Sequence, residues 1–379
     1  MRKHIKKIKW IASCLLIFAL FSTLLLAQEV KIEKKNGVVV IHNPKKPVAL
    51  PGLLSILKLR EDLRIGIESG DENYMFSQLY SIQVSDEEDV FAFDGLEVSI
   101  KVFDKNGKFI RKFGQKGQGP GEIQSPYRIT LAEDNKINIM DRGNNRFSYY
   151  SIEGECIKEI PTGKYRPLEA KADSSGNIYG IALIIGEKVT QDLVKFNQEF
   201  KPTLTITSRE MPKEPPPAIL MEFIRFQIIK DDRLIWGRTY EYEFNILDKN
   251  GKLIRQIIKD YNPIRLTKDN LIEEFKRRYP DKKIPPKLPR IPDHFPSHFP
   301  IFEDFLCGDE GRIYVRTYER DEEDNVYYDV FDPEGRYFTR FTLPFEEKVT
   351  VVKKNKMYCM IYGDKEGIPM IKRYEMKWE

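Results

Sequence analysis

Two short segments contain side chains whose types and spacing could bind a ligand. In the first, "DRGNNRFSYYS", the carboxylate of Asp141, the amide of Asn144 and the guanidinium of Arg146 can together bind a polar ligand. The alternative is a turn, in which the Asp and Asn side chains bond to backbone amides while Arg146 pairs with a nearby acid. The residue types favour the turn over the ligand site.

The second segment, "DHFPSHFP", contains His294 and His298. An HxxxH pair on a helix would place both rings on one face and suit zinc, but Pro296 interrupts any helix between them. We therefore expect these histidines to pack against Phe295 and Phe299, and we retain them as candidate ligand-binding residues without a metal.

Acidic residues recur near the ends of predicted first strands, and their oxygen atoms are ligands that a hard cation such as calcium prefers. Each also lies beside Gly, Asn or another acid in a turn, where solvated carboxylates are ordinary. The sequence contains no Gly-x-Ser-x-Gly, no HExxH and no Ser-His-Asp group, so no catalytic residue is assigned. The four recurring acids are Asp86, Glu133, Asp173 and Asp231.

An internal repeat predicts the elements that position these residues. Residues 64–94 align without gaps on residues 111–141. Turns that end in glycine also recur between pairs of short β-rich runs, and glycine supplies the positive φ that a tight hairpin needs. These glycines are Gly107, Gly154, Gly251 and Gly335.

Six units follow one another, each with four short strands. The first strands lie near Ile82, Ile129, Ala170, Ile228, Phe305 and Val351. Units of about 40 to 50 residues with four strands indicate a β-propeller. We predict an all-β, six-bladed β-propeller over residues 57–379. The sixth unit lacks a fourth strand, so we expect Leu63–Ile67 to supply it and close the ring; Val38–Asn43 competes for that position.

The stretch "FGQKGQGPGEIQSPYRI", residues 113–129, has four glycines that suggest either a phosphate-binding loop or a turn. A phosphate-binding loop needs a following helix to offer its N-terminal amides. Here prolines and a β-like run follow instead. We therefore interpret the stretch as the crossing from one blade to the next.

This stretch and the Asp141 turn closely resemble the NHL repeat, and the whole chain resembles bacterial six-bladed β-propeller proteins with degenerate NHL-like repeats. The resemblance implies a fold but no function, since this architecture hosts binding modules, lactonases and lyases. Lyases of this kind use several histidines around the tunnel, and lactonases hold a calcium ion there. The matching residues are Pro120, Gly121, Glu122, Pro126, Asp141, Gly143, Asn144 and Arg146.

The N-terminus predicts export. Residues 1–27 combine a basic stretch with an apolar run, as a signal peptide does. Residues 28–56 then form an N-terminal segment. The leader contains five of the 62 basic residues and no acidic residue. Without it, 57 basic residues stand against 58 acidic residues, so the net charge is −1. Such a chain lacks the excess of positive charge that is typical of nucleic-acid-binding proteins. We expect a periplasmic or extracellular protein that contacts the membrane only if the leader stays uncleaved as an anchor.

Residues 260–300 form a long insertion between the fourth and fifth units. A helix is predicted over Lys268–Tyr279, capped by Thr267 or Asp269 and ended by Pro280. The crossing at residues 208–223 is also long and proline-rich. The two lie on one rim, where they form either a lid over the mouth of the ring or decoration of its edge.

These observations favour a binding module for a protein, peptide or glycan, with no cofactor required. The alternative is a calcium-dependent hydrolase or lactonase at the tunnel mouth.

Overall fold

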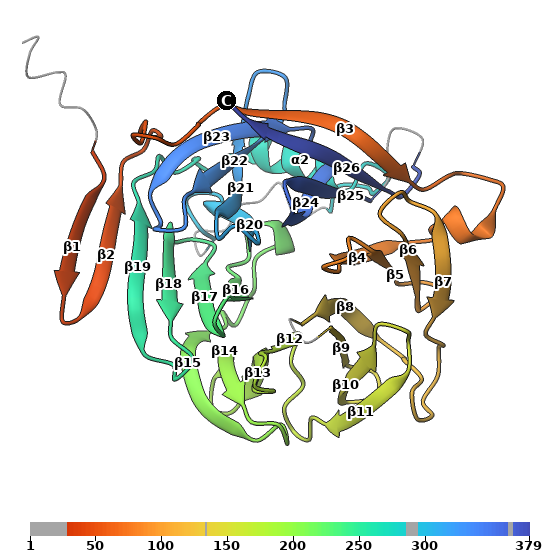
Figure 1. The fold of residues 1–379 in the computed structure, drawn as a ribbon. Coiled ribbons are helices and arrows are strands. Elements are labelled where there is room, and N and C mark those ends of the chain that lie inside the picture. The colour runs from red at the N-terminus through yellow and green to blue at the C-terminus, as the bar shows by residue number, and fades with distance from the viewer. Residues whose placement is uncertain (1–28, 133–134, 286–294, 363–366) are drawn as a thin grey trace, which may run out of the picture.

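The computed structural model describes residues 29–132, 135–285, 295–362 and 367–379; the predicted signal peptide lies outside them. Six four-stranded antiparallel units stand side by side around a common axis (Figure 1). The prediction of an all-β, six-bladed β-propeller is confirmed. The described α-helix is α2 (Lys268–Arg278), and two short 3₁₀ turns, η1 (Glu72–Tyr74) and η2 (Ala218–Leu220), lie between blades.

Blades one to three follow the chain, each with its strands in sequence order from the axis outward. Blade one contains β4 (Leu79–Val84), β5 (Val90–Asp94), β6 (Ser99–Phe103) and β7 (Phe109–Phe113). Blade two contains β8 (Pro126–Leu131), β9 (Lys136–Asp141), β10 (Arg146–Ser151) and β11 (Cys156–Pro161). Blade three contains β12 (Glu169–Ala172), β13 (Ile178–Ile185), β14 (Val189–Phe196) and β15 (Pro202–Glu210).

Blades four to six repeat the pattern with two additions from the N-terminal segment. Blade four contains β16 (Ile224–Ile229), β17 (Arg233–Arg238), β18 (Glu243–Leu247) and β19 (Leu253–Lys259), extended by β2 (Val38–Asn43) and β1 (Lys31–Lys35). Blade five contains β20 (Phe302–Cys307), β21 (Ile313–Arg320), β22 (Val326–Phe331) and β23 (Tyr337–Leu343). Blade six contains β24 (Glu347–Lys353), β25 (Lys356–Ile361), β26 (Met370–Trp378) and β3 (Leu57–Ile65).

The core lies between the blades. The two middle strands of blade one are buried at every position, because both faces of the sheet are covered by neighbouring blades. Six apolar clusters fill the six gaps between adjacent blades, from blades one and two round to blades six and one. Packing of one blade on the next therefore stabilises the ring.

The predicted hairpin glycines all have positive φ, between 80° and 102°. In blade three the corresponding turn has no glycine, and Phe200 takes the left-handed conformation with φ 60°. Its ring is buried and stacks on Phe196 with centroids 4.5 Å apart. Burial of this aromatic ring offsets the backbone strain that a non-glycine residue accepts there.

The N-terminal segment closes the ring as predicted. β3 pairs with β26 from Ile65↔Ile371 to Leu57↔Trp378, so the closing strand begins earlier than the predicted Leu63. The competing assignment of Val38–Asn43 to that position is wrong. This strand, β2, instead pairs in parallel with β19, since the chain must cross outside blades four and five before it reaches blade six (Figure 1).

One face of the ring, here called the loop face, contains the crossings between blades and the turns between the second and third strands. In blades one to five these turns are residues 95–98, 142–145, 186–188, 239–242 and 321–325. Every first strand starts at this face, and every third strand runs away from it. β26 is a third strand, so the C-terminus lies on the opposite face.

The described parts of the insertion, residues 260–285 and 295–300, pack on the loop face. Thr267 caps α2 through a reciprocal pair of hydrogen bonds with Asn270. Leu271 and Phe275 of this helix share an apolar cluster with Ile219 of the other long crossing. A groove of about 330 Å³ remains between these two segments. The two crossings therefore meet on one face, as predicted.

Within the described part of the chain, no helix has the length and apolar character needed to cross a bilayer. The three described cysteines are unpaired, and Cys156 on the outer strand of blade two is exposed. The first three residues of this outer strand are all exposed.

Candidate functional site

The Asp141 side chain organises the crossing between blades one and two. Its carboxylate accepts hydrogen bonds from the backbone amides of Gln124, Ser125, Gly143 and Asn144. Asp141 is only 1% exposed. Its oxygens are therefore used by the chain to join the crossing to the following turn.

The repeat places a second carboxylate in the same role. Asp94, 47 residues earlier, accepts from the amides of Ser77, Gln78, Leu96 and Glu97. The donors precede and follow both aspartates by the same numbers of residues. Blade one lacks the other NHL-like residues of this turn, so the aspartate alone maintains the geometry.

The other two residues of the motif also contact the Gly-rich crossing. Asn144 Nδ2 donates to the carbonyl of Gly117 at 2.9 Å. Arg146 donates to the carbonyl of Gly119 at 2.8 Å and pairs with Glu159 at 3.0 Å. The crossing is thus fixed by Asp141, Asn144 and Arg146, and their polar groups point at backbone within the molecule.

His298 lies near the end of the insertion and is half-buried. Its Nδ1 is 2.8 Å from the carbonyl oxygen of Phe299, and its ring is 5.4 Å from that of Tyr240. Phe299 is buried in the apolar cluster under α2. The second candidate histidine, His294, lies outside the described residues. The structure therefore places His298 in a packing position and does not bring it to the Asp141 turn.

Three of the four recurring acids lie in separate turns on the face opposite the loop face. Asp86 pairs with Lys353, Asp173 accepts from Asn177, and Asp231 is exposed beside Arg233. Glu133 lies outside the described residues. Nowhere in the described ranges do three His, Cys, Asp or Glu side chains come together as metal ligands.

A charged cluster around the axis was missed by sequence reasoning. Each blade from two to six contributes from the first residues of its inner strand, where the chain enters from the loop face. We call these residues the axial cluster. Its members are Arg128, Glu169, Lys171, Arg225, Glu303, Asp304 and Lys348.

The cluster connects blades that are distant in sequence. Arg128 of blade two lies 3.6 Å from Asp304 of blade five, directly across the ring, and 3.8 Å from Glu169 of blade three. Lys348 of blade six lies 3.1 Å from Asp304. The ion pairs therefore span the axis, and each carboxylate has a cationic neighbour.

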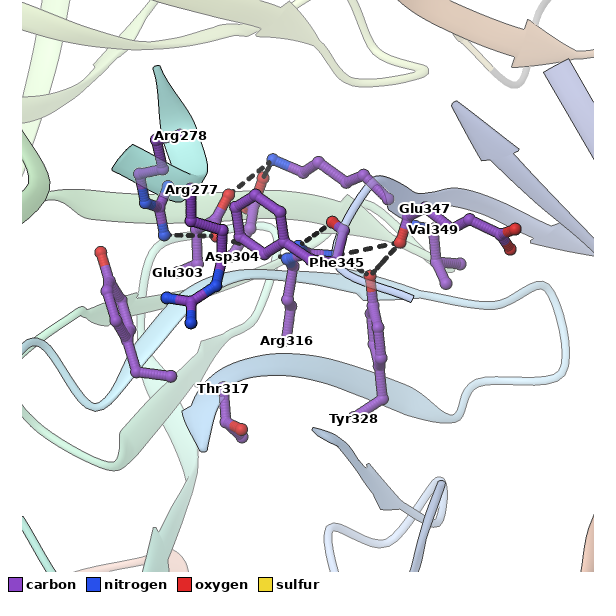
Figure 2. A network of polar contacts seen from close by, with 12 residues as sticks. Arg277, Arg278, Glu303, Asp304, Arg316, Thr317, Tyr328, Phe345, Glu347 and Val349 are labelled. Atoms are coloured by element: carbon purple, nitrogen blue, oxygen red, sulfur yellow. Dashed lines mark hydrogen bonds and ion pairs between the residues drawn. The ribbon is translucent and has the colours of Figure 1, made fainter. Parts of the chain in front are cut away.

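The helical insertion reaches this cluster from the side (Figure 2). Arg278 of α2 contacts Glu303 at 3.0 Å, and Arg316 of β21 contacts the same carboxylate at 3.3 Å. Arg316 also donates to the carbonyl of Phe345 at 2.7 Å. The insertion thus forms one wall beside the axis.

Burial and neighbouring positive charges shift the pKa values of the axial carboxylates in opposite directions. Burial alone would raise the pKa of Asp304, but Lys348 and Arg225 outweigh it and hold that pKa well below its usual range. The pKa of Glu303 is also far below its usual range, because Arg278 and Arg316 outweigh its burial. These carboxylates remain ionised at neutral pH.

Exposed apolar side chains from four blades also lie on the loop face. Tyr127 follows directly on the crossing into blade two and is 50% exposed. Ile185 and Val189 flank the turn of blade three, and Ile185 is 83% exposed. Leu96 and Tyr362 add exposed apolar surface from blades one and six. We call these five exposed side chains on the loop face the apolar rim.

A signal for the axial cluster existed in the sequence. The inner-strand segments "YRITL", "EAKA" and "FEDFL" each carry at least one charged residue among their first three positions. That these charged residues meet becomes evident only when the six inner strands are placed around one axis.

A family model described as a six-bladed β-propeller matches residues 65–212. Among solved structures, a Bacteroides fragilis protein described as exported is 10% identical, with 90% of this chain and 99% of that chain covered and a TM-score of 0.55. The fold and these matches define the class: the protein is a six-bladed β-propeller.

Two further structures are similar at lower TM-scores. A DUF4221 family member from Bacteroides vulgatus is 10% identical over 85% of this chain and 99% of that chain, with a TM-score of 0.49. An inactive virginiamycin B lyase from Staphylococcus aureus, solved with quinupristin, is 13% identical over 84% of this chain and 99% of that chain, with a TM-score of 0.43. At these identities the likeness concerns the fold alone.

Proposed function

We propose that the protein is an exported binding module that holds a protein or peptide ligand on its loop face. The observation that carries the proposal is the apolar rim, which lies on the same face as the entrance to the axial cluster. Three of its five side chains, Leu96, Ile185 and Val189, are aliphatic and suited to burial against apolar protein side chains, whereas Tyr127 and Tyr362 can also stack on a sugar. This composition favours a peptide over a glycan.

The calcium-dependent hydrolase is less well supported than binding. Glu169, Glu303 and Asp304 are the carboxylates nearest the axis, and each lies within 3.1 Å of a Lys or Arg nitrogen. A cation would have to displace these partners before it could take the oxygens.

Export is supported by the N-terminal sequence and is consistent with the description of the Bacteroides fragilis protein. We expect the mature chain to begin at Gln28. Mass spectrometry of the protein from a fractionated culture tests this; an intact leader in the cytoplasmic fraction would contradict it.

Binding can be tested with a random peptide display library and a glycan array, probed with mature protein immobilised through its C-terminus. Replacing Ile185 with Asp should reduce peptide retention about tenfold, because a buried apolar contact would be lost. Ile157→Asp is the matched control, since Ile157 is 51% exposed on the outer strand β11. Glycan binding without peptide binding, or equal losses in the two variants, would refute the proposal.

A further inference from the structure

Arg128 differs from the other arginines around the axis in how its donors are used. Its terminal nitrogens lie 3.8 Å from Glu169 and 3.6 Å from Asp304, beyond the roughly 3.2 Å limit of an N–H···O hydrogen bond. Within the described ranges its guanidinium donates no hydrogen bond and makes only these two longer ion pairs, whereas Arg316 donates to the carbonyls of Phe345 and Glu347. A guanidinium has five N–H donors, so Arg128 retains capacity for a ligand.

This guanidinium can be reached from the loop face. The Arg128 side chain is 27% exposed, and its Cζ lies 5.3 Å from the centroid of the exposed Tyr127 ring. Stacking against this ring limits the directions in which the guanidinium can point. The donors are therefore both accessible and held in place.

The surroundings carry a surplus of positive charge. Three carboxylates of the axial cluster are contacted by six cations, which leaves +3. Extending the count outward to Glu274 and Asp324 adds Arg277 and Arg320, so five acids face eight cations and the surplus is unchanged. A site with such a surplus of positive charge attracts anions.

We propose that Arg128 binds a carboxylate of the peptide ligand, an inference that rests on the proposed function. The planar fork of a guanidinium matches the two oxygens of a carboxylate and can donate to both. The carboxylate is either the C-terminus of the peptide or an Asp or Glu side chain. The apolar rim then holds the neighbouring ligand residues.

Three hexapeptide libraries separate these sources. The first has free C-termini and no Asp or Glu; the second is C-terminally amidated with one Asp or Glu; the third is amidated and neutral. Each is passed over the mature protein immobilised through its C-terminus, and retained peptides are quantified by mass spectrometry. The variants are Arg128→Ala and Arg128→Lys, and thermal unfolding confirms that they fold.

Arg233 provides the matched control, because it lies on the opposite face, is 33% exposed and pairs with Asp231 at 3.6 Å. We expect the first or second library to be retained and the third not. Arg128→Ala should reduce retention about tenfold, Arg128→Lys should restore part of it by keeping the charge, and Arg233→Ala should change nothing.

The outcomes separate this inference from the proposed function. Equal retention of all three libraries, lost in Ile185→Asp but kept in Arg128→Ala, overturns the carboxylate site and leaves peptide binding intact. Retention of no library counts against both proposals.

Discussion

At the scale of single residues, one buried carboxylate fixes each early crossing. Asp141 accepts four backbone amides while almost fully buried. Replacing it with alanine leaves these donors without a partner, so we expect Asp141→Ala to lower the free energy of unfolding by about 3 kcal/mol. Urea unfolding followed by circular dichroism measures the change.

The control for this prediction is Asp104, which accepts from the amides of Asn106 and Lys108 in a half-buried hairpin turn of blade one. Because water can replace its carboxylate there, Asp104→Ala should cost about 1 kcal/mol or less. Asp94→Ala should match Asp141→Ala. If the Asp104 and Asp141 variants lost equal stability, the assigned role of the buried carboxylate would be wrong.

At the scale of elements, β2 acts as a latch between blades four and five. Asn43 at its end is 2% exposed, donates to the carbonyls of Ile258 and Gly335, and accepts from the amide of Tyr337. Asn43→Ala should therefore lower the free energy of unfolding by about 2 kcal/mol and hasten proteolysis of the N-terminal segment.

Its neighbour His42 serves as the control for the latch, since its ring contacts only the exposed Glu33 among the described residues. Substitution of His42 by alanine should change stability by less than about 0.5 kcal/mol. Limited proteolysis and urea unfolding read out both variants. An Asn43 variant as stable as the His42 variant would show that β2 is not a latch.

At the scale of the whole molecule, the axial cluster joins five blades by charge and predicts a pH dependence. The pKa values of Glu169, Glu303 and Asp304 are lowered in the folded state. In the unfolded chain such groups titrate near pH 4. Their contribution to stability is therefore complete above about pH 5 and is lost as the pH falls below about 4 toward the lower folded-state values.

Thermal unfolding between pH 3 and 7 measures this effect. The melting temperature should hold between pH 5 and 7 and fall steeply below about pH 4. In Asp304→Asn, which removes one titrating group, the protein should be less stable at pH 7 and its fall at low pH shallower. A melting temperature that is unchanged down to pH 3 would contradict the prediction.

The sequence by itself determined the class of fold and the pieces of each blade. Repeated turns at Gly107 and Gly251, and alternating apolar runs between them, specify local hairpins, and local hairpins depend on neighbouring residues alone. The helix over Lys268–Tyr279 was predictable for the same reason, since its cap and its apolar stripe are local signals.

Only the tertiary structure decided which charged residues meet. Arg128 and Asp304 are 176 positions apart and come together because six blades share one axis. It also decided between β2 and β3 as the closing strand, which depends on the path of the chain outside blades four and five. Contacts of this kind depend on how the blades are arranged in space, and no short stretch of sequence records that arrangement.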